Sequence, residues 1–175
     1  IVAATGVNTM LFGESGSGKE LLARFIHAHS SRSDQPFVSV NCASMPVDLA
    51  ESLLFGHHKG AFAGADEEHV GYLVSAANGT LFLNGVAELP LELQAKLLHF
   101  LESGEVLPLG SAKPVNVDVR LIAASSSDLG RMVDQGSFRQ DLYYRLNVVP
   151  LEIPPLRKRR GDVPILLTHF VSLFS

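Results

Sequence analysis

The stretch that decides the fold is Gly13-Glu14-Ser15-Gly16-Ser17-Gly18-Lys19, which fits the pattern G-x-x-x-x-G-K. It follows an apolar run at residues 9–12 and precedes a helical pattern. Glycines let such a loop turn tightly enough for several backbone N–H groups to point at phosphate oxygens, and the helix N-terminus adds partial positive charge. The lysine reaches the terminal phosphates. The stretch therefore predicts a phosphate-binding loop rather than a Gly/Ser-rich turn with a solvated lysine.

Around this loop, apolar runs alternate with helical patterns. Strands are expected at residues 9–12, 37–40, 80–83, 117–124 and 148–153, whose near-continuous hydrophobicity is typical of strands buried on both faces of a parallel sheet. In the helical pattern at 19–29, Leu22, Phe25 and Ile26 share one face, and leucines recur at spacings of three and four in 91–101. We expect an α/β domain with a mostly parallel sheet between two layers of helices, a three-layer αβα fold.

Composition narrows the class of protein. The chain has 175 residues, 46% of them hydrophobic and 18% charged, which is enough apolar material for a core. A net charge of -4 argues against a surface that binds duplex DNA. The single cysteine, Cys42, excludes an internal disulfide framework and is expected in the core. No apolar run approaches the roughly 20 residues of a membrane span, so we expect a cytoplasmic domain.

Further motifs follow the P-loop in order along nearly the whole chain. They are Asn41-Cys42, Phe55-Gly56-His57, Gly60-Ala61-Phe62-Ala63-Gly64-Ala65, Gly79-Thr80-Leu81-Phe82-Leu83 and the segment 138–147. Together they resemble the AAA+ domain of bacterial enhancer-binding proteins, the transcriptional activators that remodel sigma-54 RNA polymerase. In that family a Glu after the P-loop lysine is normal, so Glu20 fits, although most other P-loops carry a Ser or Thr there that ligates Mg²⁺.

The resemblance implies a domain organisation and a ligand. Residues 1–153 correspond to the AAA+ core, whose first helix precedes Ile1, and residues 154–175 to a hinge and the first helix of a lid. The chain is then a fragment, and DNA is bound by a separate C-terminal domain outside it. ATP or ADP is bound by the P-loop, Gly13, Glu14, Ser15, Gly16, Ser17, Gly18, Lys19 and Glu20.

The chain departs from the family where hydrolysis occurs. The family has Asp-Glu after Gly-Thr-Leu-Phe-Leu, where the Asp orients Mg²⁺ and the Glu polarises the attacking water; here Asn84 and Gly85 stand instead. Ser126 replaces an Asn that senses the terminal phosphate. Loss of a general base alone typically costs about 10²–10⁴ in rate, and the Mg²⁺ site is weakened too. Glu88, three residues further on, is disfavoured as a substitute for the lost carboxylate, because a strand end and the turn after it rarely present two such positions to the same water.

The elements that contact sigma-54 in the family are also altered. The family's output loop reads Gly-Ala-Phe-Thr-Gly-Ala, whereas Ala63 removes the threonine hydroxyl from the loop Gly60–Ala65. A Glu near the base of this loop and an Arg on a second loop communicate in the family. The corresponding residues are Val74 and Pro108.

Other family residues are retained. Asn41 matches the residue that restrains the catalytic Glu, and Arg139 and Arg145 match arginines that reach the terminal phosphate of a neighbouring subunit. Arginine suits that role because its planar fork binds phosphate in two places. The alternative for both arginines is a structural salt bridge with an acidic neighbour such as Asp141.

A branch of the family works without sigma-54. VpsR-like and FleQ-like regulators of biofilm and flagella bind cyclic di-GMP, and the degenerate site resembles the VpsR-like ones. Arg24 corresponds to an arginine that contacts cyclic di-GMP, although Phe25 replaces the Asn beside it and a packing or helix-surface role is the alternative. The segment 157–160, Arg-Lys-Arg-Arg, is expected as the hinge rather than a nucleic-acid patch. His57, His58 and His69 match no metal-ligand spacing.

The sequence thus predicts a nucleotide-binding regulator domain with little ATPase activity. Bound ATP, ADP or cyclic di-GMP controls self-association into dimers or hexamers, and the full-length protein acts on RNA polymerase holoenzyme, with no membrane partner. The alternative is an active sigma-54-dependent ATPase with a displaced catalytic carboxylate.

Overall fold

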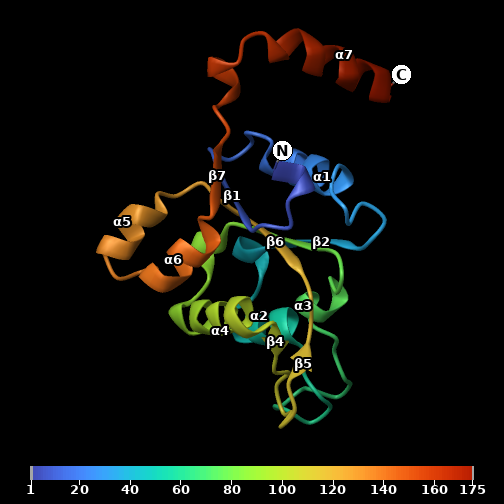
Figure 1. Ribbon diagram of the computed structural model, residues 1–175, viewed down its shortest axis with the longest axis vertical. Coiled ribbons are helices and arrows are strands. Elements are labelled where there is room, and N and C mark those ends of the chain that lie inside the picture. The colour runs from blue at the N-terminus through green and yellow to red at the C-terminus, as the bar shows by residue number, and fades with distance from the viewer. Residues whose placement is uncertain (1, 175) are drawn as a thin grey trace.

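The computed structural model describes residues 2–174, without the side chains at positions 169, 170, 173 and 174. Five parallel strands form the central sheet in the order β2-β3-β6-β1-β7. Their bounds are β1 Thr9–Phe12, β2 Phe37–Asn41, β3 Thr80–Asn84, β6 Arg120–Ser125 and β7 Val149–Glu152. Because all five run in one direction, their carboxyl ends share one edge, and the P-loop leaves the sheet there, at the end of β1 (Figure 1).

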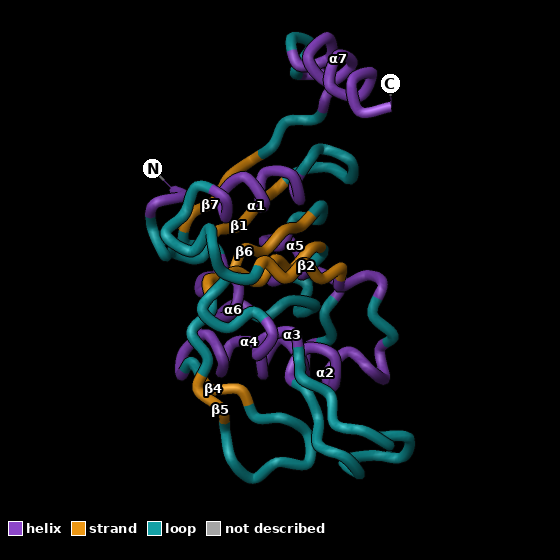
Figure 2. The backbone as a smooth tube through the Cα atoms, turned by 90° about the vertical axis from the view of Figure 1, so that its right-hand side faces the viewer, coloured by secondary structure: helices purple, strands orange, loops and turns teal. Residues whose placement is uncertain are grey.

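Helices cover both faces of this sheet (Figure 2). One face carries α1 (Lys19–Ala28), with the short 3₁₀ helix η1 (Val2–Ala4) beside it. The helices on the other face are α2 (Val47–Phe55), α3 (Tyr72–Ser75), α4 (Leu91–Ser103), α5 (Leu129–Asp134) and α6 (Gln140–Leu146). Single 3₁₀ turns follow β2 and β3 as η2 (Cys42–Ser44) and η3 (Val86–Glu88). The three-layer αβα prediction is confirmed.

The strands alternate between two cores, as buried parallel strands must. In β3, Leu81 and Leu83 pack with α2 to α6 while Phe82 packs against α1, and all three are fully buried. Cys42 belongs to the larger core, where burial raises the pKa of its thiol to about 12. Successive residues of a strand therefore pack against opposite helical layers.

Two details of the sequence prediction are wrong. The strand expected at 117–124 begins only at Arg120, because Val115–Asn116 (β5) pairs antiparallel with Glu105–Val106 (β4) and Val117 N donates to the Gly104 carbonyl. Phe25 does not lie in the buried face of α1; the residue is 57% exposed, and its ring packs at a tilt against that of His29 with centroids 4.1 Å apart. The buried residues of that helix include Ala23, Ile26 and His27.

The two ends of the molecule differ in structure. Beyond β7 the chain passes two prolines into η4 (Leu156–Lys158) and α7 (Asp162–Phe174), which lies above α1 in Figure 1. The loop Gly60–Ala65 and the β4–β5 hairpin lie at the opposite end (Figure 1). Within residues 2–174, no helix combines the length and hydropathy that a membrane crossing requires.

Candidate nucleotide-binding site

The P-loop joins β1 to α1 through backbone conformations that favour glycine. Gly16 and Gly18 have φ values of 77° and 95°, and Gly18 caps the N-terminus of α1. Gly13 meets a different constraint: a Cβ there would lie 2.7 Å from Ser17 Oγ and 2.9 Å from the Ile153 carbonyl oxygen. Glycine is therefore required at all three positions, and the loop wraps the start of the helix as a phosphate cradle does.

Lys19 is held across this loop by two hydrogen bonds. Its Nζ donates to the carbonyl oxygens of Gly13 at 2.7 Å and Glu14 at 2.9 Å, and the residue is only 8% exposed. Burial lowers the pKa of the ammonium group because its positive charge is partly desolvated. A phosphate placed here would restore solvation to that charge, which favours binding of an anion.

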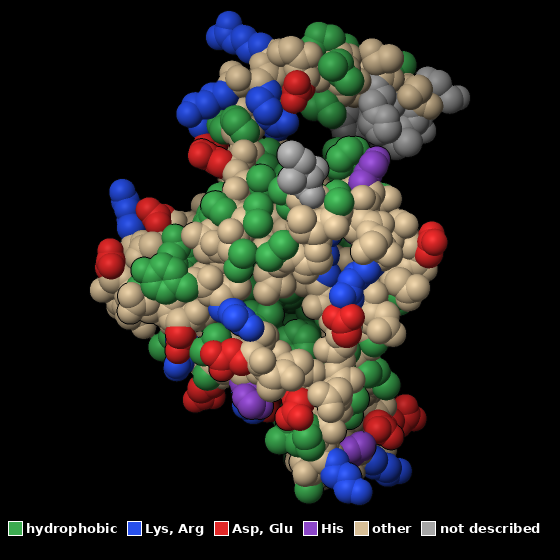
Figure 3. All heavy atoms as spheres, in the orientation of Figure 1, with side chains coloured by type: hydrophobic (Ala, Val, Ile, Leu, Met, Phe, Trp, Pro, Cys, Tyr) green, Lys and Arg blue, Asp and Glu red, His purple; other side chains and the backbone are tan. Residues whose placement is uncertain are grey.

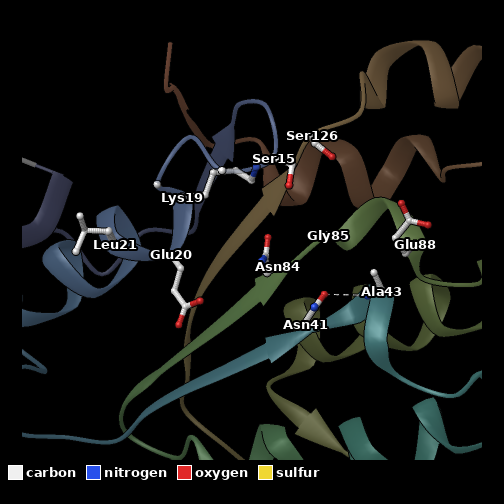
Figure 4. A pocket seen from close by; sticks show the side chains of 12 residues that line it. Ser15, Lys19, Glu20, Leu21, Asn41, Ala43, Asn84, Gly85, Glu88 and Ser126 are labelled. Carbon is white, nitrogen blue, oxygen red and sulfur yellow. Dashed lines mark hydrogen bonds between the residues drawn. The ribbon is translucent and has the colours of Figure 1, made fainter. Parts of the chain in front are cut away.

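A cavity of about 470 Å³ opens in front of the P-loop at the carboxyl edge of the sheet (Figure 4). Its walls come from the P-loop, α1, and the ends of β2, β3 and β6. The lining residues are Ser15, Gly16, Gly18, Lys19, Glu20, Leu21, Asn41, Ala43, Asn84, Gly85, Glu88 and Ser126. The structure therefore brings the predicted phosphate-binding residues and the predicted degenerate positions into one site. Leu21 and Ala43 are additions that the sequence did not single out.

Two amides stand where β2 and β3 end. Asn41 and Asn84 are register partners in adjacent strands, and Asn41 Oδ1 accepts a hydrogen bond from Ala43 N at 3.2 Å. Gly85 follows with φ 78°, and its N–H donates to the Ala124 carbonyl at 2.9 Å. These strand ends carry neutral side chains or none, so this wall offers hydrogen bonds without charge.

Glu88 adds a carboxylate to the same cavity (Figure 4). A Cβ built on Gly85 would lie 3.8 Å from Glu88 Cγ, so the Glu88 side chain passes close to the space that a side chain at position 85 would enter. Glu88 is exposed and belongs to η3, three residues beyond the strand end. Its carboxylate can reach the cavity from the turn rather than from the strand.

Arg24 is engaged on the surface of α1. Its guanidinium pairs with Glu20 at 2.7 Å and lies 4.8 Å above the centre of the Phe37 ring. Glu20 Oε1 also accepts from Ser39 Oγ at 3.4 Å. Arg24 therefore has the helix-surface salt bridge that was the alternative to a ligand role.

The hinge contacts the P-loop directly. Arg157 donates two hydrogen bonds to the Glu14 carboxylate at 2.6 and 2.7 Å, which lowers the pKa of Glu14. Arg159 Nη2 donates to the Ser17 carbonyl at 2.9 Å. Figure 3 shows Lys and Arg side chains gathered around this junction. The basic run therefore holds the hinge against the P-loop; we call these contacts the clamp. A second cavity of about 740 Å³ lies beside it and is lined in part by Glu14, Ser126 and Lys158.

The two predicted trans-acting arginines have local partners within this chain. Arg139 forms a fork with Asp141 at 2.7 and 3.1 Å, and Arg145 donates to the Leu101 carbonyl at 2.9 Å. Neither is among the residues that line the two cavities. Both side chains are exposed, so they are accessible to another subunit.

The loop Gly60–Ala65 is a tight turn. Gly60 N donates to the Ala65 carbonyl at 2.8 Å, and Phe62 packs edge-on against His57 with ring centroids 5.0 Å apart. Ala63 is exposed at the tip. Val74 packs against the larger core rather than presenting a polar group toward the loop.

The sequence did not indicate two buried polar groups. His27 Nδ1 lies 2.9 Å from Thr80 Oγ1, and both residues are buried. Arg120, 2% exposed, donates to the carbonyls of Val2 and Ala3. These residues fix α1 and η1 to the sheet. The sequence feature that could have indicated them is a polar residue inside an apolar run: His27 follows Phe25-Ile26, and Arg120 stands between Val119 and Leu121.

The sheet order and the glycine-rich loop after β1 define a P-loop domain of the AAA+ type. The chain belongs to the family of sigma-54 interaction domains, the AAA+ domains of bacterial transcriptional regulators, because the profile of that family, described as "Sigma-54 interaction domain", matches residues 1–152. The resemblance to sigma-54 activators is therefore confirmed.

Individual relatives agree. The transcriptional regulatory protein ZraR of Escherichia coli is 50% identical over 175 residues, which is 100% of this chain and 40% of ZraR. NtrX of Brucella abortus, solved in complex with ATP, is 42% identical with a TM-score of 0.89 over 98% of this chain and 38% of NtrX. NtrX solved with ADP gives 42% identity and a TM-score of 0.91, over 98% of this chain and 37% of NtrX. The chain thus spans well under half the length of these relatives.

Proposed function

We propose that this domain binds ATP or ADP and uses the bound nucleotide to control self-association of a bacterial transcriptional regulator, with little or no hydrolysis. The observation that carries the proposal is the asymmetry of the cavity. Its P-loop wall is complete, with Lys19 and the glycines in place, while the strand ends opposite carry Asn84 and Gly85. Such a site can hold phosphates but lacks the carboxylates that the family uses to activate water.

Binding of ATP and ADP is supported by NtrX, which was solved with each of them at 42% identity. The exposed Arg139 and Arg145 support a role at a subunit interface, either in a dimer or a hexamer. We further propose that the core spans residues 1–153 and the hinge and lid begin at 154. In the full-length protein, a C-terminal domain outside this chain would bind DNA, and the assembly would act on RNA polymerase holoenzyme.

Membership of the VpsR-like branch is part of the proposal, and cyclic di-GMP is its second candidate ligand. Binding through Arg24 would have to compete with the existing contacts to Glu20 and Phe37. Calorimetric titration of the protein and of Arg24→Ala with cyclic di-GMP tests this. Binding that Arg24→Ala abolishes supports it, and absence of heat on titration rejects it.

The main test compares ligand binding with turnover. Calorimetry with ATP should show saturable binding that Lys19→Ala abolishes, because Lys19 supplies the positively charged side chain in the lining of this cavity. Phosphate release should not exceed that of the Lys19→Ala control. Saturable binding together with clear turnover would reject the non-hydrolysing function.

The second candidate function is an active sigma-54-dependent ATPase. It is favoured by the position of Glu88 in the cavity wall and by the sigma-54 family itself. In this case the Glu88 carboxylate would take the role of the missing general base. It predicts ATP-dependent open-complex formation at a sigma-54 promoter, lost in Glu88→Gln and in Phe62→Ala.

A further inference from the structure

The side chains of the cavity do not fit a Mg²⁺ site. Mg²⁺ requires near-octahedral oxygen ligands and is usually held by one or two carboxylates together with substrate phosphates. P-loop proteins commonly supply a Ser or Thr after the lysine and an Asp at the end of a neighbouring strand. Here those positions hold Glu20 and Asn84. Among the described residues, no group of three or more His, Cys, Asp or Glu side chains is arranged to hold a metal ion.

The Glu20 carboxylate is paired with Arg24 of the same helix. Its Oε1 accepts from Arg24 Nη2 at 2.7 Å and Nε at 3.2 Å, and from Ser39 Oγ at 3.4 Å. Figure 4 shows this carboxylate on the opposite side of the cavity from Glu88. The charge of Glu20 is therefore already compensated, and a cation gains less from it than from an unpaired carboxylate.

Asn84 can offer only a neutral amide oxygen. It stands beside Asn41 in register, so the ends of β2 and β3 bring no negative charge to the cavity. Gly85 adds no ligand. A hard divalent cation gains most from anionic oxygen, and these strand ends provide none; the cavity's other carboxylate besides Glu20, that of Glu88, comes from η3 beyond the strand end.

The same substitutions remove the reason for a metal in binding. A nucleotide carries several negative charges, which strand-end carboxylates would repel unless a cation lay between them. With neutral strand ends, that repulsion is absent, while Lys19 and the N–H groups of the P-loop still attract the phosphates. Lys19 therefore supplies a positive charge for the phosphates, and the strand ends carry no carboxylates whose repulsion a metal ion would have to screen.

We infer that this domain binds ATP and ADP without requiring Mg²⁺. The inference rests on the proposed nucleotide binding. It adds that the free nucleotide binds about as tightly as its magnesium complex. Asn84 determines this specificity. A carboxylate at position 84 would bind Mg²⁺ and so favour the magnesium complex of the nucleotide, whereas the neutral amide of Asn84 gives no such preference.

The test is calorimetric titration of the full chain with ATP and with ADP, once with excess Mg²⁺ and once with excess EDTA at equal ionic strength. We expect Kd values within about threefold of one another, with binding in both buffers lost in Lys19→Ala. Binding at least about tenfold weaker in EDTA overturns the inference and leaves the proposed function intact. Absence of binding in both buffers overturns the proposed function and this inference with it.

A charge variant locates the cause. Asn84→Asp restores a carboxylate at the end of β3 and should create a preference of at least about tenfold for the buffer with Mg²⁺. The matched control, Asn116→Asp, adds the same charge on the exposed strand β5, outside the cavity, and should bind equally in both buffers. Equal binding by Asn84→Asp in both buffers would overturn the role assigned to this residue.

Discussion

Restoring the two strand-end carboxylates should restore hydrolysis. In the double variant Asn84→Asp, Gly85→Glu, a charged metal ligand and a general base return to the wall opposite the P-loop. Loss of a general base typically lowers rates by about 10²–10⁴, so we expect phosphate release to rise by at least about 10² over the unmodified domain. The space allows it, because a Cβ at position 85 would lie 3.8 Å from Glu88 Cγ and 4.0 Å from Ala43 N.

The same variant should be less stable. Gly85 has φ 78°, and a side chain in this left-handed region costs about 1–2 kcal/mol. For a domain of this size, each kcal/mol lowers the melting temperature by about 2–4 °C, so a decrease of about 2–8 °C is expected. The gain in rate must therefore be measured below the melting transition.

Steady-state phosphate release at saturating Mg²⁺-ATP, together with thermal melting, measures both effects. Gly85→Ala is the control, because it carries the same backbone strain without a carboxylate; it should melt lower and release no more phosphate than the unmodified domain. A folded double variant that binds ATP and shows no rise in turnover would refute the explanation based on lost carboxylates.

Three other contacts give further expectations. Gly13→Ala should destabilise the domain by about 1–3 kcal/mol and weaken nucleotide binding, because its Cβ would lie 2.9 Å from the Ile153 carbonyl oxygen. The control is Gly6→Ala, whose Cβ would have nothing within 4 Å, and it should have the melting temperature of the unmodified domain. Arg157→Leu removes the fork to Glu14 and should accelerate limited proteolysis at the hinge while barely moving the melting temperature, since both side chains are exposed; an unchanged cleavage rate would contradict the clamp. Burial holds the pKa of His27 below 6.5, so the unfolded chain binds a proton that the folded chain does not. The free energy of unfolding should therefore fall as the pH drops below 6.5 and through the folded pKa, and urea unfolding of His27→Gln should lack this component.

The sequence determined the layers of the fold well. Apolar runs such as β3 carry enough hydrophobicity to specify a buried parallel strand, and the glycine pattern before Lys19 located the P-loop. The start of β6 was predicted three residues too early because Val117 and Val119 look like strand residues, yet the hydrogen bond from Val117 N to the Gly104 carbonyl holds this segment beside the start of β4 instead. Local propensity does not reveal such a competing partner.

The site was predictable in its residues and less so in their contacts. Asn84, Gly85, Ser126 and the P-loop do line one cavity, because parallel strand ends meet at one edge of the sheet. The clamp from the hinge to Glu14 joins residues 143 positions apart, a separation at which sequence spacing carries no information. The outward position of Phe25 likewise depends on which side of α1 the sheet lies.

We propose that the domain holds ATP without cleaving it. The most direct measurement is the identity of the nucleotide recovered from the protein after prolonged incubation with a stoichiometric amount of ATP and Mg²⁺. We expect intact ATP to be recovered from the unmodified domain, and no nucleotide to be retained by Lys19→Ala. Recovery of ADP with release of phosphate beyond that of a protein-free control would contradict it.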